Sequence, residues 1–203
     1  MTTSIKRPEG FLIPLPGGGS QHGVDQEWYA RHWQRTAGCG PCTASNILRY
    51  YRDRLTLPLP AEDKAQMQRL MAWVWEYIRP GMMGLNTTAR YQQGMDNLLQ
   101  AIDSPMRTRT LDIDAARDSR PSAGQVADFL REALAADQPV AFLNLSNGAL
   151  KNLENWHWVT IIGLDESGGR LQASVVDNGR LLDLDMDTWL DTTTRGGGFA
   201  VTG

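Results

Sequence analysis

Residues 38–48 read GCGPCTASNIL and place a cysteine at the point where a helix begins. The chain turns at Gly40-Pro41, and apolar residues then recur at helical spacing as far as Tyr51. The first N–H groups of a helix have no partner within the helix and mark the positive end of its dipole. A thiol at this position is therefore stabilised as the thiolate, which is the nucleophilic form of cysteine. The stretch thus makes Cys39 a candidate nucleophile.

The same stretch allows a second chemistry. Residues 39–42 also spell the redox motif of thioredoxins, in which two thiols at a helix start cycle through a disulfide. In thioredoxins this motif follows a strongly apolar strand, whereas residues 29–38 here are polar. We therefore favour a single nucleophile and keep a thiol–disulfide oxidoreductase, which would use Cys39 and Cys42, as the alternative.

A nucleophilic cysteine needs a base to share its proton and a third group to orient that base. The chain has three histidines. His22 lies in the Gly/Pro-rich residues 14–23 and His32 in the polar run before the cysteine, so we interpret both as exposed surface residues. His157 instead opens a β-rich run and is the candidate base, its alternative being a packed strand histidine without chemistry.

The partner of His157 is predicted by the hairpin that follows it. One strand spans residues 157–165, a turn follows, and a second strand over 171–176 ends at Asp177 and Asn178. In such a hairpin the start of the first strand lies beside the end of the second. We therefore expect Asp177, or alternatively Asn178, to orient the imidazole ring of His157.

These motifs resemble the papain-like cysteine peptidase superfamily, and within it the bacteriocin-processing (double-glycine-leader) peptidases and their stand-alone relatives. The similarity rests on three short segments: the Cys39-Gly40-Pro41 start with Leu48, Tyr50 and Tyr51 after it, the strand from His157-Trp158-Val159 to Gly163, and the strand Val175-Val176-Asp177. The resemblance implies a cysteine peptidase with a Cys39, His157 and Asp177 triad, acting on a peptide or protein. The separation of His157 from Asp177 is longer than in that family, which implies a longer hairpin or a bulge.

The resemblance also suggests roles for two further residues. By analogy Gln34 completes the oxyanion hole together with the N–H of the nucleophile, although it stands one residue closer to Cys39 than is usual. Papain carries a Cys-Gly-Ser-Cys run whose second cysteine is the nucleophile, so Cys42 is an alternative nucleophile here. We otherwise interpret Cys42 as a small residue packed under the helix, or as a resolving thiol.

Composition limits the classes of partner. The chain has 203 residues, 41% of them hydrophobic, which is enough for one substantial core. A formal charge of −3 gives no electrostatic reason to expect a nucleic acid or an anionic membrane, and no apolar run is long enough to span a bilayer. The N-terminal residues lack the apolar core of a signal peptide, and the two cysteines fit a reducing compartment, so we expect a cytoplasmic protein. No metal-ligand spacing is visible, and we predict no metal or cofactor; the sequence does not indicate an oligomeric state.

The order of the elements predicts an α+β fold. Residues 43–136 are expected to be mostly helical and residues 139–201 mostly antiparallel sheet. We expect one papain-like domain over 1–203, with a leader segment (1–28), a mainly helical lobe (29–138) that carries the nucleophile helix, and a mainly antiparallel sheet lobe (139–203). The site would then lie between the lobes. An acyltransferase, a deamidase or a non-catalytic binding module on the same scaffold are the remaining alternatives.

Overall fold

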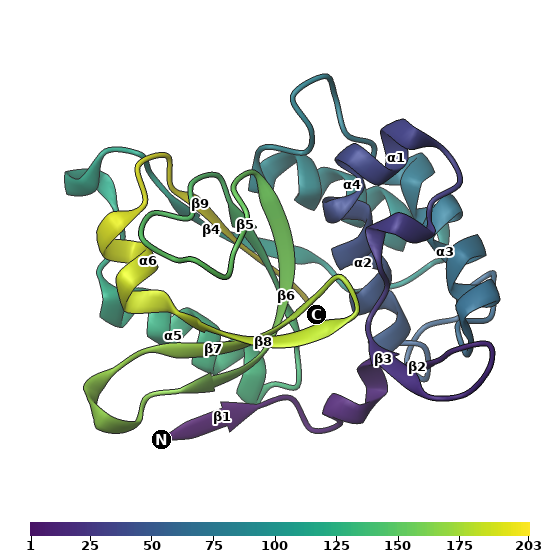
Figure 1. Cartoon of the computed structure of the whole chain (residues 1–203), viewed down its shortest axis with the longest axis horizontal. Coiled ribbons are helices and arrows are strands. Elements are labelled where there is room, and N and C mark those ends of the chain that lie inside the picture. Colours follow the sequence, from purple (N-terminus) through teal and green to yellow (C-terminus); the bar gives the residue numbers. More distant parts are fainter.

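Six α-helices, nine strands and four short 3-10 helices make up the computed structural model, which describes residues 1–203. The helices are α1 (His32–Ala37), α2 (Cys39–Tyr50), α3 (Lys64–Tyr77), α4 (Thr88–Ala101), α5 (Ala123–Ala135) and α6 (Met186–Thr192). The strands are β1 (Thr2–Ser4), β2 (Leu12–Pro14), β3 (Ser20–His22), β4 (Thr108–Ile113), β5 (Val140–Asn144), β6 (His157–Asp165), β7 (Gln172–Asp177), β8 (Arg180–Asp185) and β9 (Gly197–Thr202). Helices α1 to α4 gather on one side of the molecule, and the large sheet lies on the other with α5 and α6 (Figure 1). The protein is therefore α+β, as the sequence predicts.

The large sheet has seven strands and is antiparallel throughout. Six of them follow the order β4-β9-β5-β6-β7-β8, and β1 pairs with the far end of β6. Strand β5 pairs with the first part of β6 and β1 with its last part, so β6 is bonded along most of its length. A register shift between Ile161 and Gly163 interrupts the pairing of β6 with β7. The long separation between His157 and Asp177 implies a longer hairpin or a bulge, and this register shift lies between those two residues in the hairpin.

Local signals in the sequence fix the longer helices. Apolar residues recur at helical spacing over residues 61–78, and this stretch forms α3, whose inward side chains Met67, Leu70 and Val74 are buried. The side chain of Ser122 caps α5 and forms a reciprocal capping box with Gln125, in line with the Ser-x-x-Gln spacing of these residues in the sequence. Because these caps and apolar stripes depend only on residues close together in the sequence, the helices can be predicted without knowledge of the tertiary fold.

Several strands were not predicted. The leader segment contains β1, which joins the large sheet, and a separate hairpin of β2 and β3. Strand β4 lies inside the stretch expected to be mostly helical, and β8 and α6 follow the predicted hairpin of residues 157–176. Short polar segments of this kind become strands because a distant partner pairs with their backbone, and such partners cannot be read from local periodicity.

Helix α2 is the centre of the molecule. Every residue from Gly40 to Tyr50 is buried, and the helix packs against α3 on one side and β6 on the other. Two of its polar side chains bond to the leader segment: Asn46 Oδ1 accepts the Val24 N–H at 2.8 Å, and the Arg49 guanidinium donates to the carbonyls of Gly10 and Leu12. The leader segment is thus an integral part of the fold that holds the nucleophile helix in place.

Across the whole chain, no helix combines the length and the apolar character needed to cross a bilayer.

Candidate active site

Cys39 is the first residue of α2 and is half-buried at the surface end of that helix. The backbone N–H of Cys42 donates to the Gly38 carbonyl at 2.9 Å, which closes the first helical turn. Gly40 allows a close approach of the neighbouring chain, because a Cβ atom there would lie 2.5 Å from Leu85 Cδ2 and the Leu85 side chain would have to shift. The turn and the glycine therefore place the Cys39 thiol at a helix N-terminus with the neighbouring chain closely packed against it.

His157 begins β6 and meets Asp177 at the end of β7. The two strands are neighbours in the sheet, and His157 Nε2 lies 2.7 Å from Asp177 Oδ1. The imidazole is 6% exposed, and the Asp177 side chain is also largely buried. Cys39 lines the same small pocket as His157 and Asp177, and Cys39 Sγ lies 4.0 Å from the carbonyl oxygen of Trp156, the residue that precedes the histidine. The structure thus brings Cys39, His157 and Asp177 together from α2, β6 and β7.

The surroundings of His157 favour its charged form. Burial alone would lower the pKa of the imidazole, but the hydrogen bonds to Asp177 and Cys39 and the charges of those groups raise it to about 10. These surroundings favour the imidazolium form of the ring at neutral pH, with the Asp177 carboxylate as its hydrogen-bond partner. In this form His157 can act as a general acid and donate its proton to a leaving group.

Asn178, the alternative orienting residue, contacts a different partner. It forms with Gly179 the two-residue turn between β7 and β8, with φ of 42° and 81° respectively, which is the geometry that Asn-Gly turns adopt. Its side-chain Oδ1 accepts the backbone N–H of Gln26 at 3.2 Å. Asn178 therefore ties the leader segment to the turn, and Asp177 is the residue in contact with the imidazole.

Cys42 points into the core. Its side chain is 6% exposed and belongs to the main hydrophobic cluster. Burial raises the pKa of the Cys42 thiol well above its usual range, and the negative charge of Cys39 acts in the same direction. A thiol with these surroundings is a poor nucleophile. Both cysteines are free, without a disulfide between them.

Gln34, the expected oxyanion donor, does not share a cavity with Cys39. Gln34 lies on α1, where its side chain lines a hollow of about 500 Å³ between α1 and α3 with Trp75 and Arg79. The preceding residue, Trp33, is the one that shares a cavity with Cys39. Gln34 and Cys39 therefore line different cavities, with Trp33 common to both.

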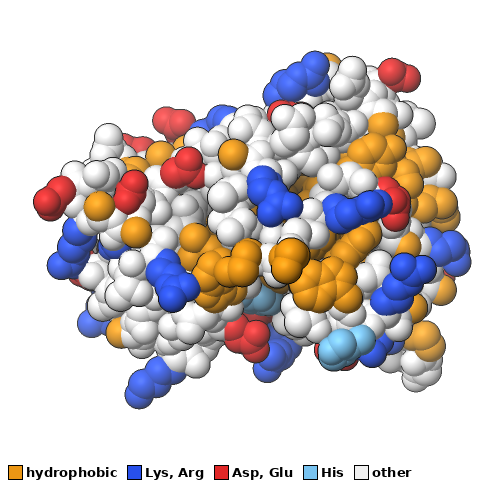
Figure 2. Space-filling model, turned by 90° about the horizontal axis from the view of Figure 1, so that it is seen from above, with side chains coloured by type: hydrophobic (Ala, Val, Ile, Leu, Met, Phe, Trp, Pro, Cys, Tyr) orange, Lys and Arg blue, Asp and Glu red, His pale blue; other side chains and the backbone are white.

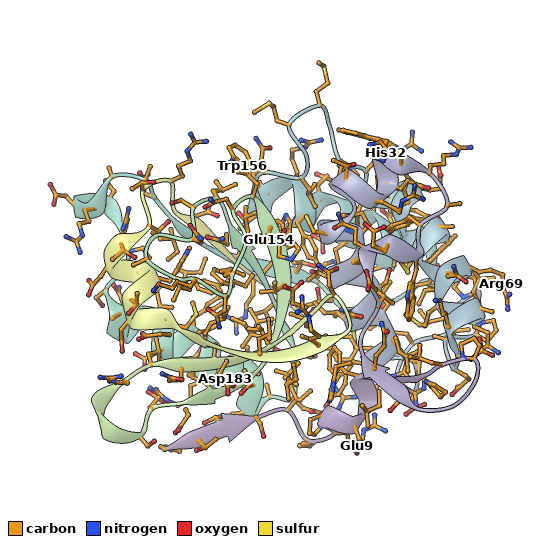
Figure 3. All side chains as sticks on the ribbon, viewed as in Figure 1. Glu9, His32, Arg69, Glu154, Trp156 and Asp183 are labelled. Carbon is orange, nitrogen blue, oxygen red and sulfur yellow. The ribbon has the colours of Figure 1, made fainter.

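A second cavity, which we call the methionine cleft, adjoins Cys39 and was not predicted. It has a volume of about 290 Å³, and its apolar walls include Trp33, Met82, Met83, Leu85, Leu143 and Trp156. The two methionines form the tip of a tight hairpin in which Gly81 and Gly84 exchange backbone hydrogen bonds. This hairpin projects above α1 and the sheet, and Trp156 lies at the same upper surface (Figure 3). The sequence signal was the run Gly81-Met82-Met83-Gly84 itself, in which two large apolar residues stand between turn-forming glycines.

The base of this hairpin is fixed to the site. Trp158, which follows His157, donates its indole N–H to the Leu85 carbonyl at 2.6 Å and stacks on Tyr91 of α4 with ring centroids 4.7 Å apart. Leu85 is buried against Gly40, whereas Met82 at the tip is 96% exposed. The hairpin is thus anchored at its base and free at its tip.

No three His, Cys, Asp or Glu side chains gather as metal ligands anywhere in the chain.

No family model and no curated protein matches the sequence. Among solved structures, the fold is similar to that of the digestive procathepsin L2 proteinase from the larval midgut of Tenebrio molitor, with 11% identity and a TM-score of 0.46. The superposition covers 98% of this chain and 67% of that one. A likeness this distant concerns the general course of the chain and says nothing about the residues of the site.

Proposed function

We propose that the protein is a cysteine-nucleophile acyl-transfer hydrolase, specifically a peptidase of the papain-like kind, acting on a peptide or protein substrate in the cytoplasm. The observation that carries the proposal is the imidazole of His157, which lies 2.7 Å from Asp177 and lines the same small pocket as the helix-start Cys39. Nucleophile, base and orienting carboxylate in this mutual contact are the requirement for covalent acyl transfer.

The chemistry proceeds in two halves. Cys39 Sγ, as thiolate, attacks the substrate carbonyl carbon and forms a tetrahedral intermediate, and the imidazolium of His157 then gives its proton to the leaving nitrogen as the C–N bond breaks. The product of this half is a thioester on Cys39 and a free amine. His157, now neutral, takes a proton from water as the water oxygen attacks the thioester carbonyl. The acid leaves, and the thiolate–imidazolium pair is restored with Asp177 holding the ring throughout.

The negative oxygen of the tetrahedral intermediate needs donors. The backbone N–H of Cys39 supplies one, because the first N–H groups of a helix are free of intrahelical bonds. We retain Gln34 as the proposed second donor, with the condition that its side chain turn from its hollow beside Trp75 toward the thiol when substrate binds.

The alternatives differ in what they require. A thiol–disulfide oxidoreductase needs both cysteines and no histidine, and the burial of Cys42 in the core does not favour it. An acyltransferase or a deamidase would use the same triad: in an acyltransferase a nucleophile other than water releases the acyl group, and in a deamidase the leaving amine is ammonia. Product analysis separates these from a peptidase.

The test is alkylation of each cysteine by iodoacetamide, followed by mass spectrometry across a pH series. In wild-type protein we expect Cys39 to be labelled at mildly acidic pH and Cys42 to be protected. In His157→Gln the labelling of Cys39 should become slow at that pH, while Cys42→Ser, the matched control, should leave it unchanged. Turnover of any substrate should fall by roughly a thousandfold or more in Cys39→Ala. A fully active Cys39→Ala protein would refute the proposal.

A further inference from the structure

Large apolar side chains are exposed around the methionine cleft. The chain exposes six of them, and four line this cavity: Trp33 (48% exposed), Met82 (96%), Met83 (63%) and Trp156 (40%). The face seen in Figure 2 accordingly carries apolar side chains at its centre with arginine or lysine side chains around them. An exposed apolar patch of this kind rimmed by polar residues marks a binding surface. Because Cys39 is itself one of the lining residues, a molecule bound here lies beside the thiol.

A basic hollow continues from the cleft on the other side of Trp33. This second cavity, of about 500 Å³, is lined by Arg31, Trp33, Gln34, Trp75, Glu76 and Arg79 among others. Arg79 is paired with Glu76, whereas the Arg31 side chain forms no ion pair and no hydrogen bond within the protein. Trp33 therefore separates an apolar cavity at the nucleophile from a hollow that holds a free cation.

We propose that these two cavities are successive subsites for an extended peptide: the methionine cleft takes a bulky apolar side chain next to the scissile bond, and Arg31 binds an acidic side chain further along. The inference rests on the proposed function, since it makes Cys39 the group that attacks the bound peptide. Met82 and Met83 are specificity-determining residues in this arrangement. Their flexible thioether side chains can adapt to apolar groups of different shape.

The sizes and charges of the two cavities favour a peptide over a long acyl chain. A volume of about 290 Å³ lies at the lower limit for pockets that enclose a drug-sized ligand, so the cleft suits one large side chain. A hydrocarbon that continued past Trp33 would enter the hollow of Arg31, Glu76 and Arg79, where charged groups would lose hydration without gaining a partner. A peptide alternates apolar and charged side chains and satisfies both cavities.

Wild-type protein, Cys39→Ala and subsite variants are incubated with a mixture of peptides of known sequence, and the cut bonds are identified by mass spectrometry. We expect cuts that disappear in Cys39→Ala, with Leu, Phe or Met fixed at one position beside the cut bond and Asp or Glu further along on the same side. Met83→Glu should lower kcat/KM for the best peptide by about 10- to 200-fold, the range for losing apolar contact in a specificity pocket.

Arg31→Glu should lower kcat/KM by up to about fivefold, the size of an exposed ion pair, and should exchange the acidic preference for a basic one. The matched controls are Leu181→Ser, an exposed apolar residue outside the cleft, and Arg69→Glu on the surface of α3. Neither should change the preference. Hydrolysis of p-nitrophenyl octanoate by the same proteins tests whether an acyl chain, rather than a peptide, is accepted as substrate.

The outcomes separate the two levels of inference. Cuts that persist in Cys39→Ala at the wild-type rate would refute the proposed function itself. Cuts that depend on Cys39 but show no apolar preference, or that respond to Met83→Glu no more than to Leu181→Ser, would refute the subsites and leave the proposed function standing. Failure to cut any peptide, with or without hydrolysis of the octanoate ester, would overturn the peptide as occupant while His157-dependent alkylation of Cys39 still reports an assembled site.

Discussion

Replacement of Asp177 by Asn is the substitution that most directly probes the geometry of the site. Asn keeps an oxygen acceptor 2.7 Å from His157 Nε2 but removes the negative charge that stabilises the imidazolium. A hydrogen bond to a charged acceptor contributes about 1.5–3 kcal/mol and a neutral one about 0.5–1.5 kcal/mol. The difference of about 1 kcal/mol or more corresponds to nearly one pKa unit, before the longer-range attraction of the carboxylate is counted. In Asp177→Asn the pKa of His157 should therefore fall from about 10 to about 9 or below.

NMR titration of the histidine ring signals measures this directly, because the chain has only three histidines and His157→Gln assigns the one of interest. The alkaline limit of the activity should move to lower pH by the same amount, since His157 must carry the proton that the leaving amine receives. Cys39→Ala in the same titration separates the contribution of the sulfur from that of the carboxylate. If His157 in the wild-type protein titrates at or below its ordinary pKa of 6.5, the ion pair described here does not exist.

Three further predictions concern stability. The pKa of His157 in the folded protein is raised from 6.5 to about 10, so its contribution to the free energy of unfolding is complete below pH 6.5 and is lost as the pH rises through 10. Urea unfolding at a series of pH values should show this decline in wild type and a flatter profile in His157→Gln. Gly40→Val, whose side chain would begin 2.5 Å from Leu85, should lower the free energy of unfolding by about 1–3 kcal/mol, and an unchanged urea midpoint would contradict the packing. Asp137→Ala leaves the Tyr50 hydroxyl without its carboxylate acceptor and should cost about 1–3 kcal/mol, part of which Tyr50→Phe in the same background should restore, as measured by a double-mutant cycle.

The helix start at Cys39 could be predicted because its signals are local. A turn at Gly40-Pro41 and apolar residues at helical spacing define α2 within a few turns of chain. The hairpin of β6 and β7 was readable for the same reason, and its ends place His157 beside Asp177 without any knowledge of the rest of the fold. The sequence does not give the distance from Cys39 to the His157–Asp177 pair, because that distance depends on the packing of α2 against β6.

The misses have identifiable causes. Gln34 was inferred by counting back from Cys39, whereas neighbouring residues of the helix α1 point about 100° apart, and it is Trp33 that lines a cavity together with Cys39. The Asn178-Gly179 pair is a strong hairpin signal that was interpreted as the end of a strand, so β8 was overlooked. Strand β1 has only three residues, and its strand structure comes from pairing with β6, far away in sequence.

The separate anchoring of the Gly81–Gly84 hairpin has a consequence for how such a protein can change. Its base is held by Leu85 and Trp158, whereas the methionines at its tip contribute nothing to the buried core. Substitutions at the tip therefore alter recognition without a cost in folding, while the groups that break the bond remain on elements locked inside the molecule. Substitutions at this one short turn, by natural drift or in a laboratory library, can therefore change substrate selectivity while the catalytic residues stay the same.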